Sequence, residues 1–433
     1  MHTVIVGAGF GGLAAANAIT DNGGRVTLID QRNHHTFQPL LYQVATAGLT
    51  ASDVCYSTRS IARRNARLTS LQATGTGFDR ETRTVTCADG THVGYDALVL
   101  AMGAVTADFG VPGVTAHAFG LKSAAEADAV RRHVLTCFED AARAATKGTT
   151  PDDALTTIVV VGGGPTGVEM AGGYAELTDR VLHRDYPELD PAATRVVLVE
   201  GRDALLNGFA PKLARNARRT LERMGVEVQL GEQVAKITDR TVELASGIHI
   251  DTATVVWAAG VRAHPMAERL GLATGRAGRV LVDDHLRVAG YDEVYAIGDL
   301  AAAPNPQHPG QLLPQVAPVA VQAGEHVAAH IAGRATEPFR YRDKGSMATI
   351  GRNAAVVERP NGFTMTGFVG WIAWLGLHLI MLMGFRNRAT VFVNWAWNYL
   401  TYDRASRVLI DPVNPVTPAL GVPNHQPDLR QSP

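Results

Sequence analysis

The chain is poor in cysteine. Its 433 residues include three cysteines, Cys55, Cys87 and Cys137, which lie far apart in the sequence. No pair has the Cys-x-x-Cys spacing of a redox-active dithiol. This pattern argues against chemistry based on a local disulfide. It favours a reducing compartment, in which each cysteine is a small buried apolar residue.

The positive and negative charges of the chain also nearly balance. Charged residues make up 19% and the formal net charge is −1, so composition predicts no nucleic-acid partner. The first predicted strand begins at His2, which leaves no room for a targeting leader and predicts a cytoplasmic protein. The length predicts about two or three domains with enough chain to bury a core.

What the sequence does contain is two copies of one strand-turn-helix pattern. Each copy is a β-branched run, then Gly-x-Gly-x-x-Gly, then an alanine-rich stretch. The glycines are Gly7, Gly9 and Gly12 in the first copy and Gly162, Gly164 and Gly167 in the second. In such a motif the first glycine permits the tight turn, the second lets the backbone approach a pyrophosphate, and the third lets the helix pack on the strand. The following helix directs its free N–H groups at the phosphates. We therefore predict two dinucleotide sites.

Each copy is followed by an acidic residue at the end of the next predicted strand. Asp30 ends the first such strand and Glu200 ends the second. A glycine-rich turn alone is common in α/β proteins, but a carboxylate at this distance is placed to accept the ribose hydroxyls. Glu200 should also disfavour the 2′-phosphate of NADPH, although the adjacent Arg202 keeps NADPH open.

A further motif distinguishes the two sites. Residues 293–300 read as a strand followed by Gly298-Asp299, and this resembles the second flavin fingerprint of two-dinucleotide flavoproteins, in which the aspartate binds the ribityl chain. Gly-Asp is also a common turn pair. The segments ending at Gly103 and Gly260 resemble the crossovers between the two nucleotide domains of such proteins. The resemblance implies FAD at the first site and a nicotinamide dinucleotide at the second.

These landmarks predict an α/β fold with two Rossmann-like dinucleotide-binding domains of the three-layer, glutathione-reductase-like kind, plus a C-terminal domain. We expect the FAD-binding domain at 1–115 and 283–335, the NAD-binding domain at 156–282, and a helical connection at 116–155 with a helix over 123–147. Short antiparallel strands are expected between Leu68 and Val93. The C-terminal region should run over 336–410, followed by a disordered polar tail at 411–433.

The C-terminal region contains two apolar stretches. Residues 367–385 carry no Asp, Glu, Lys or Arg and are followed by Arg386 and Arg388; the second stretch is 389–402. The first is long enough to raise the question of a membrane span. Its glycines and tryptophans and the flanking arginines instead favour amphipathic helices that lie in the membrane interface. A buried, dimer-forming helix pair is the alternative.

Three stretches, 35–45, 344–356 and 384–404, resemble the type II NADH dehydrogenases, which are single-chain NADH:quinone oxidoreductases. The resemblance extends over nearly the whole chain. It implies FAD, NADH and a membrane quinone, with no proton pumping and no metal. It also implies a homodimer attached to the inner, cytoplasmic face of the membrane, where anionic lipid would be its partner.

The same resemblance suggests site residues. Glu169 resembles the family acid between nicotinamide and quinone, although an acid in the first turn of a helix is also stabilised by the helix dipole. Gln43 and Ala317 are implied to contact FAD. Gln322 and Lys344 are implied to act on the quinone side, with His378 as a weaker candidate for proton supply.

One position departs from the family pattern. Pro318 stands where the family's quinone-side helix usually has its first glutamine. Proline is well tolerated in the first turn of a helix, and that helix N-terminus would still stabilise an anionic reduced flavin. One quinone hydrogen-bond donor of the family is therefore missing. Either Gln315 substitutes for it, or the acceptor is not the usual long-tailed quinone.

Other functions remain open at this point. A sulfide:quinone reductase would need two cysteines to meet near the flavin. The main rival is a soluble reductase of the same fold that acts on a small aromatic or quinoid metabolite or on a protein acceptor. A flavin-bearing redox sensor is a third possibility, because a fold does not determine a function.

Overall fold

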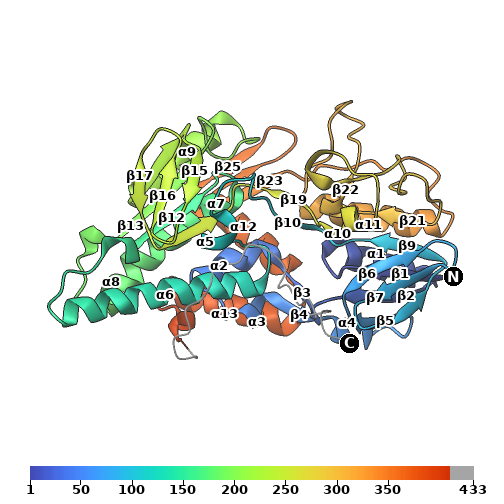
Figure 1. Ribbon diagram of the computed structural model, residues 1–433, viewed down its shortest axis with the longest axis horizontal. Helices are drawn as coiled ribbons and strands as arrows, with labels where there is room; N and C mark the ends of the chain where they lie inside the picture. Colours follow the sequence, from blue (N-terminus) through green and yellow to red (C-terminus); the bar gives the residue numbers. More distant parts are fainter. Residues whose placement is uncertain (410–433) are drawn as a thin grey trace, which may run out of the picture.

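The computed structural model describes residues 1–409, so the tail expected at 411–433 lies outside the described residues. Two five-stranded sheets dominate the molecule (Figure 1). In both sheets every neighbouring pair of strands is parallel. The first sheet has the order β21(Val294–Ala296), β9(Ala97–Leu100), β1(His2–Val6), β2(Arg25–Asp30), β5(Leu68–Gln72). The second has the order β11(Ala118–Phe119), β18(Thr254–Trp257), β12(Thr157–Val161), β13(Arg195–Glu200), β14(Val226–Leu230).

Burial explains why these segments form parallel strands. All five residues of β12 are buried, as expected of a strand covered on both faces of its sheet. β2 pairs in register with β1, and β13 pairs in register with β12. Asp30 therefore lies at the carboxyl end of its sheet, next to the first glycine turn. Glu200 lies in the same way next to the second glycine turn. The α/β class with two Rossmann-like parallel sheets is confirmed.

The chain leaves the first sheet, builds the second and then returns. β21 pairs with β9, although β9 ends at Leu100 and β21 begins only at Val294. The two crossovers, β10(Ala104–Thr106) and β19(Val261–Ala263), pair with each other antiparallel. The short strand β11 lies within the expected helical connection and extends the second sheet. The expected domain boundaries stay a prediction.

One expectation about the strands was wrong in part. Only three strands between Leu68 and Val93 form an antiparallel sheet: β6(Gly75–Asp79), β7(Thr84–Cys87) and β8(His92–Gly94). β5, at the start of that range, lies parallel to β2. The helix α4(Thr58–Ala62) precedes β5, and a helical crossover returns the chain in the parallel direction.

The remaining strands form small sheets around these two. Two more are three-stranded and antiparallel: β15(Val234–Ile237), β16(Thr241–Leu244), β17(His249–Asp251), and β23(Ser346–Gly351), β24(Ala354–Glu358), β25(Thr364–Thr366). Two pairs complete the set: β3(His34–Thr36) with β4(Cys55–Ser57), and β20(Val280–Leu281) with β22(Ala301–Ala302).

The longest helix is the one that the sequence predicted over 123–147. It runs Ala124–Thr146 as α6, and the Ser123 side chain caps it by accepting from Glu126 N at 3.2 Å. The other helices are α1(Phe10–Asp21), α2(Leu41–Ala45), α3(Ala51–Val54), α5(Val114–His117), α7(Pro165–Leu177), α8(His183–Asp185), α9(Pro211–Arg223), α10(Met266–Arg269), α11(Ala317–Ile331), α12(Gly367–Met381) and α13(Phe385–Thr401).

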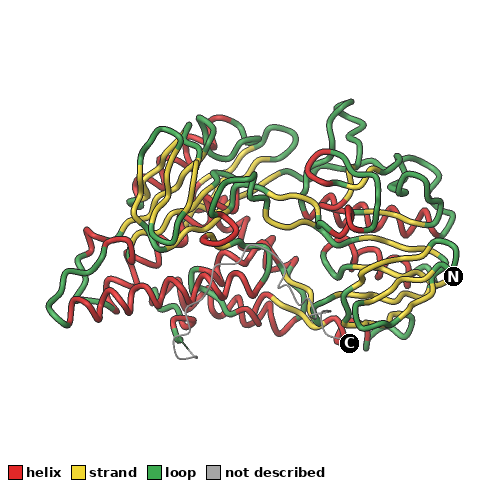
Figure 2. The backbone as a smooth tube through the Cα atoms, viewed as in Figure 1, coloured by secondary structure: helices red, strands yellow, loops and turns green. Residues whose placement is uncertain are grey.

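The largest hydrophobic cluster joins parts of the chain that are far apart in sequence. It contains residues of α2, α6 and α7 together with Trp374, Leu382 and Val391 of the C-terminal region. In the shared view of Figure 1 and Figure 2, α2, α6 and α13 lie below the second sheet. The C-terminal helices are thus anchored to the nucleotide-binding part by apolar packing.

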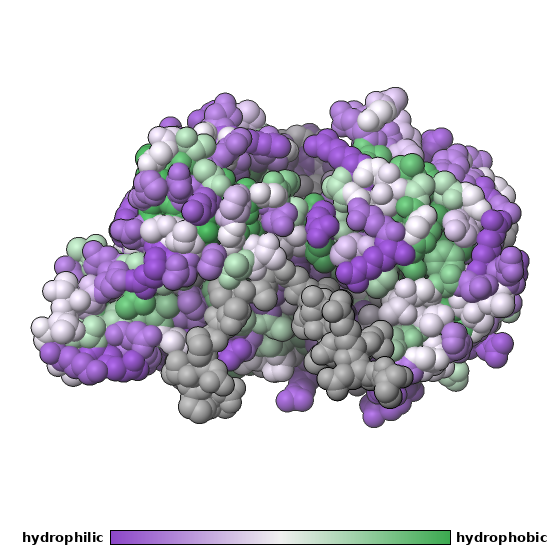
Figure 3. Space-filling view, viewed as in Figure 1, coloured by the Kyte–Doolittle hydropathy of each residue, from purple (hydrophilic) through white to green (hydrophobic). Residues whose placement is uncertain are grey.

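The apolar run at 367–385 is interrupted. α12 has 15 residues, or about 22 Å of helix against a bilayer core of about 30 Å, and α13 begins only after Gly384, whose φ is 84°. Across residues 1–409, no helix is both long enough and apolar enough to cross a membrane. In the view of Figure 3, hydrophilic and hydrophobic side chains are interspersed over both halves of the molecule.

We predict that the close contact of α7 with β23 is essential for stability. A Cβ on Gly172 would collide with the backbone oxygen of Ile350. Gly172→Ala should therefore lower the free energy of unfolding by roughly 1–3 kcal/mol, measured by urea denaturation. The matched control is Gly376→Ala in α12, where a Cβ would meet no heavy atom within 4 Å. The control should raise stability by up to about 1 kcal/mol. Equal effects of both substitutions would contradict the predicted role of this contact.

Candidate functional site

The turn between β1 and α1 is closed on one side and open on the other. A Cβ on Gly7 would collide with the Ala101 backbone oxygen, and one on Gly12 would collide with the Gly7 oxygen. A Cβ on Gly9 would meet no heavy atom within 4 Å. The open side at Gly9 lies at the N-terminus of α1. A pyrophosphate bound there would accept hydrogen bonds from the backbone N–H groups of the first turn.

Asp30 lies beside this turn. Its carboxylate accepts hydrogen bonds from Ala8 N and Arg32 N, both at 2.7 Å. A carboxylate has about four acceptor positions, so two such bonds fix its orientation and leave capacity for ribose hydroxyls. The residues present fit the adenosine end of a dinucleotide.

The second turn has the same construction. A Cβ on Gly162 or Gly167 would collide with backbone atoms, whereas one on Gly164, at the N-terminus of α7, would meet none within 4 Å. Glu200 accepts from Gly163 N and, at 2.9 Å, from Arg202 N. The two sheets therefore carry equivalent glycine turns, each with an acidic residue beside it, at the carboxyl ends of their strands.

Two helix N-termini meet at the first site. α1 and α11 pack closely, because a Cβ on Gly11 would lie 2.9 Å from the Ala320 oxygen. The partial positive charges at their first turns are therefore close together, which suits an anionic cofactor. Ala317 is the first residue of α11, with Pro318 in the same turn.

Asp299 lies next to this helix end. Its carboxylate lies 3.9 Å from Lys122 Nζ, and its backbone oxygen accepts from Gln315 Nε2 at 2.8 Å. Gln315 is therefore engaged with the Asp299 backbone. The crossover glycines differ from each other: a Cβ on Gly103 would meet open space, and one on Gly260 would lie 2.8 Å from the Phe109 ring.

A cavity separates the nucleotide-binding part from the C-terminal helices. It has a volume of about 120 Å³ and is open to solvent. Its walls come from α2, α7, the end of β23, α12 and α13. The lining residues are Tyr42, Gln43, Thr46, Gly48, Glu169, Gly173, Glu176, Arg180, Val181, Thr349, Gly351, Arg352, Trp371, Leu375, Trp395, Asn398, Tyr399, Tyr402 and Arg404.

Glu169 lines this cavity from the first half of α7. Thr349 N donates to its carboxyl oxygen at 3.4 Å. Burial raises the pKa of Glu169 to about 8, against weaker opposing effects from hydrogen bonds of Thr349 and Trp374. The side chain is therefore a neutral carboxylic acid at pH 7, with a proton available to a molecule in the cavity.

A chain of hydrogen bonds links α13 to α2 in the wall of the cavity. Trp395 Nε1 donates to Gln43 Oε1 at 2.7 Å, and Gln43 Nε2 donates to the Tyr42 hydroxyl at 2.8 Å. The Tyr42 ring meets Trp374 edge to face, with centroids 6.0 Å apart. Gln43 was predicted to contact FAD, and the structure places its side chain on the cavity wall between α2 and α13.

A partly buried ion pair joins α7 to the end of the C-terminal region. Arg404 Nη2 donates to Glu176 at 3.0 Å, and Arg404 Nη1 donates to the Thr46 oxygen at 2.6 Å. Burial lowers the pKa of Arg404, and the Glu176 carboxylate opposes this shift. The Arg352 guanidinium lies 4.0 Å from the ring centroids of both Tyr399 and Tyr402. These residues form a partly cationic, aromatic wall.

Three predicted residues lie away from the cavity. Gln322 uses both ends of its amide on the Arg342 backbone, at 3.0 and 2.9 Å. Lys344 is exposed in the loop that precedes β23. His378 is buried with its ring stacked on Trp374 at 4.0 Å, and burial lowers its pKa to about 4. His378 is therefore neutral at pH 7 and holds no extra proton to deliver.

Sequence reasoning missed several cavity residues. Tyr42, Glu176 and Thr349 were not selected, although Tyr42 lies next to Gln43 in the sequence and Glu176 lies seven residues after Glu169. Two carboxylates seven residues apart share one face of a helix, which in an otherwise apolar helix indicates a polar cavity. Among residues 1–409 the three cysteines are free, so no cysteine pair meets in space.

Comparisons with known proteins agree along the whole chain. The family model for pyridine nucleotide-disulphide oxidoreductases matches residues 1–324, and the model for the NDH2 C-terminal domain matches residues 344–402. The chain is 38% identical over 421 residues to type II NADH:quinone oxidoreductase NdhA of Mycobacterium tuberculosis, covering 92% of this chain and 87% of that protein. It is 31% identical over 370 residues to the type II NADH:quinone oxidoreductase of Staphylococcus aureus, covering 82% and 88%.

Solved structures show the same fold. NDH2 from Plasmodium falciparum in complex with NADH aligns with a TM-score of 0.84 at 19% identity, over 95% of this chain and 99% of that one. The sulfide:quinone oxidoreductase of Aquifex aeolicus aligns with a TM-score of 0.71 at 15% identity, over 92% and 95%.

We predict that Glu169 makes stability depend on pH. The carboxyl pKa is about 8 in the folded chain and near 4.5 when exposed. Between these values the unfolded chain releases the proton that the folded chain retains, so folding loses free energy as the pH rises. Glu169→Gln removes this loss. From about pH 5 to about pH 8, its stability relative to the parent should rise by roughly 1–3 kcal/mol in urea denaturation, allowing for solvent access from the cavity.

The control is Asp203→Asn, at an exposed carboxylate remote from the cavity. The difference between this variant and the parent should stay constant across the same pH range. A constant difference for Glu169→Gln as well would show that Glu169 ionises normally.

Proposed function

Because the chain belongs to the type II NADH:quinone oxidoreductases, we propose that NADH binds at the Gly162–Gly167 turn and that quinone binds in the cavity lined by Glu169. The overall reaction converts NADH, one proton and quinone into NAD⁺ and quinol. Two electrons and one proton come from NADH as hydride, and the second proton comes from solvent. The observation that carries the proposal is that α7 begins at the nucleotide turn and presents Glu169 to the cavity.

The family binds FAD and NAD(H). FAD supplies, when bound, an acceptor for the hydride and a donor of two electrons to quinone. At the first site, the residues of the chain bind and orient FAD. We assign the pyrophosphate to Gly7, Gly9 and Gly12, the adenosine ribose to Asp30, and the ribityl side to Asp299. The N-termini of α1 and α11 would favour its anionic form.

At the second site, Glu200 orients the adenosine ribose of the nucleotide. Its carboxylate is already fixed by Gly163 N and Arg202 N, so it accepts ribose hydroxyls without having to be ordered first. It would repel a 2′-phosphate. This arrangement favours NADH over NADPH.

The cavity suits a quinone for two reasons. Trp371, Trp395 and Tyr399 provide flat apolar surface for a planar ring, and Glu169 provides a proton at neutral pH. A neutral acid can hydrogen-bond to a carbonyl oxygen and transfer a proton as that oxygen gains charge. Gln322 and Lys344 do not line the cavity, and this proposal gives them no contact with the quinone.

The cavity mouth adjoins an apolar surface. Side chains of α12 and α13 remain exposed although they are large and hydrophobic: Phe368, Val369, Ile372, Leu377, Ile380, Met381, Phe385, Phe392, Val393, Trp397 and Leu400. An exposed surface of this kind indicates an interaction site. We propose that it lies in the inner, cytoplasmic leaflet of a membrane, with Arg386 near anionic headgroups, so that a lipid-soluble quinone enters the cavity from the bilayer. A homodimer through the same helices is the alternative.

Blocking the cavity tests the quinone site. Asn398→Trp places a bulky ring in the lining of the cavity and should lower kcat/KM for a short-chain quinone at least tenfold. Anaerobic reduction of the bound flavin by NADH, measured by absorbance, should stay within about twofold, because the nucleotide turn is untouched. The control is Ala396→Trp, an exposed position of the same helix outside the lining. Unchanged quinone kinetics in Asn398→Trp would place the quinone elsewhere.

The membrane surface is tested by flotation with anionic liposomes. The double variant Ile380→Glu, Leu400→Glu removes two side chains that are 70% and 78% exposed, and it should reduce the lipid-bound fraction about tenfold or more. The control, Leu281→Glu, changes an exposed leucine on β20 and should float like the parent. If the parent fails to float but the double variant changes a dimer into a monomer, the surface is a contact between two copies of the chain.

A further inference from the structure

We infer that Tyr42 is a positioning residue for the quinone, whose hydroxyl donates a hydrogen bond to a quinone carbonyl oxygen and is aimed by Gln43 and Trp395. The inference rests on the proposed function, because it takes the cavity as the quinone site. It adds a residue and a direction of hydrogen bonding that the assignment of Glu169 does not require.

The direction follows from the chemistry of the three side chains. An indole N–H is only a donor, so the amide atom that lies 2.7 Å from Trp395 Nε1 must be the Gln43 oxygen. The opposite end of the amide, its NH₂ group, then lies 2.8 Å from the Tyr42 hydroxyl. An amide NH₂ group is only a donor. In this bond, therefore, the Tyr42 oxygen accepts.

This leaves the phenolic hydrogen of Tyr42 available. A tyrosine hydroxyl has one hydrogen, and within residues 1–409 no protein acceptor takes it. Tyr42 is only 9% exposed, yet it lines the cavity. A desolvated donor without an acceptor destabilises the protein by about 1–3 kcal/mol. A ligand that places an acceptor next to the Tyr42 hydroxyl removes this cost, and its binding free energy becomes more favourable.

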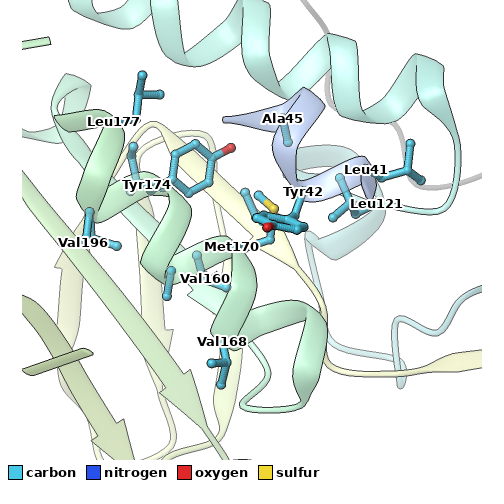
Figure 4. Packing of buried hydrophobic residues seen from close by; sticks show 14 of the residues in the cluster. Leu41, Tyr42, Ala45, Leu121, Val160, Val168, Met170, Tyr174, Leu177 and Val196 are labelled. Atoms are coloured by element: carbon cyan, nitrogen blue, oxygen red, sulfur yellow. The ribbon is translucent and has the colours of Figure 1, made fainter. Parts of the chain in front are cut away.

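The ring of Tyr42 is fixed by packing. It meets Trp374 edge to face at 6.0 Å, and Figure 4 shows it beside Met170 of α7, with Ala45 and Leu41 on its own helix. Burial, and next the nearby Glu169 carboxyl, raise the pKa of Tyr42 well above its ordinary value. The hydroxyl therefore remains a donor at neutral pH.

The ligand that fits is one that accepts and does not donate. A quinone has two carbonyl acceptors and no N–H or O–H group. The cavity presents it with a phenol from Tyr42 and a neutral acid from Glu169. A site built from donors discriminates strongly against a molecule of the same shape without the acceptor. A merely structural hydroxyl on Tyr42 would show no such discrimination.

The experiment compares two ligands of similar shape. Menadione has both carbonyl groups, and 2-methylnaphthalene has neither. Each is titrated into the FAD-loaded protein, and binding is followed by quenching of tryptophan fluorescence, since Trp371 and Trp395 line the cavity. Tyr42→Phe should weaken menadione about five- to tenfold and leave 2-methylnaphthalene within about twofold.

Two further variants sharpen the test. Gln43→Glu keeps the size of the side chain but presents an acceptor to both neighbours, which draws the Tyr42 hydrogen away from the cavity. It should reproduce the selective loss of menadione seen with Tyr42→Phe. The matched control is Tyr174→Phe, which removes a buried hydroxyl without a partner on α7, outside the cavity lining. Tyr174→Phe should change neither affinity by more than about twofold.

The outcomes separate this inference from the proposed function. If menadione binds the parent, Asn398→Trp blocks it and Tyr42→Phe weakens both ligands equally or neither, the inference is overturned and the cavity assignment survives. If menadione fails to quench the parent and Asn398→Trp leaves quinone reduction unchanged, the cavity assignment fails and the inference fails with it. Selective loss of menadione in both Tyr42→Phe and Gln43→Glu supports the inference.

Discussion

The site depends on one close packing contact, that of the α7 backbone against β23. Gly172 has no side chain at the point where the Ile350 oxygen lies against the helix. Because the helix can approach this closely, its N-terminus stays at the second nucleotide turn while Glu169 and Glu176 face the cavity. A single helix thus connects the second glycine turn with the cavity in which we propose that quinone binds.

The cavity is held together by polar groups that the apolar core has desolvated. Arg404 is neutralised by Glu176 and bonded to the Thr46 oxygen, and breaking such a pair would leave an uncompensated buried charge. Burial raises the pKa of Glu169 to about 8, and among the described residues no cation is bonded to its carboxyl to oppose this shift. Of the two carboxyl groups on this helix, Glu176 is paired with a guanidinium and Glu169 is not.

Several features followed from local sequence, and others did not. The glycine turns, the acidic residues that end β2 and β13, and helix α6 were predictable, because each depends on residues close together in the chain. The direction of β5 was missed, because it depends on the short helix α4 that precedes it. Gln322, which stays a prediction as a quinone-side residue, bonds to the Arg342 backbone. No local pattern indicates which backbone group a glutamine will reach.

The sequence alone determined the two nucleotide cradles and the family, since the conformation of a glycine turn and the spacing to its acidic partner are local properties. Only the tertiary structure decided what lies between them. The cavity is lined by residues from 42–48, 169–181, 349–352 and 371–404, which meet because their apolar faces share one core. The raised pKa of Glu169 is a consequence of that burial, and the free hydrogen inferred for Tyr42 follows from the hydrogen bonds that join it to Gln43 and Trp395. Desolvation is a property of the assembled surroundings and is not encoded at either residue.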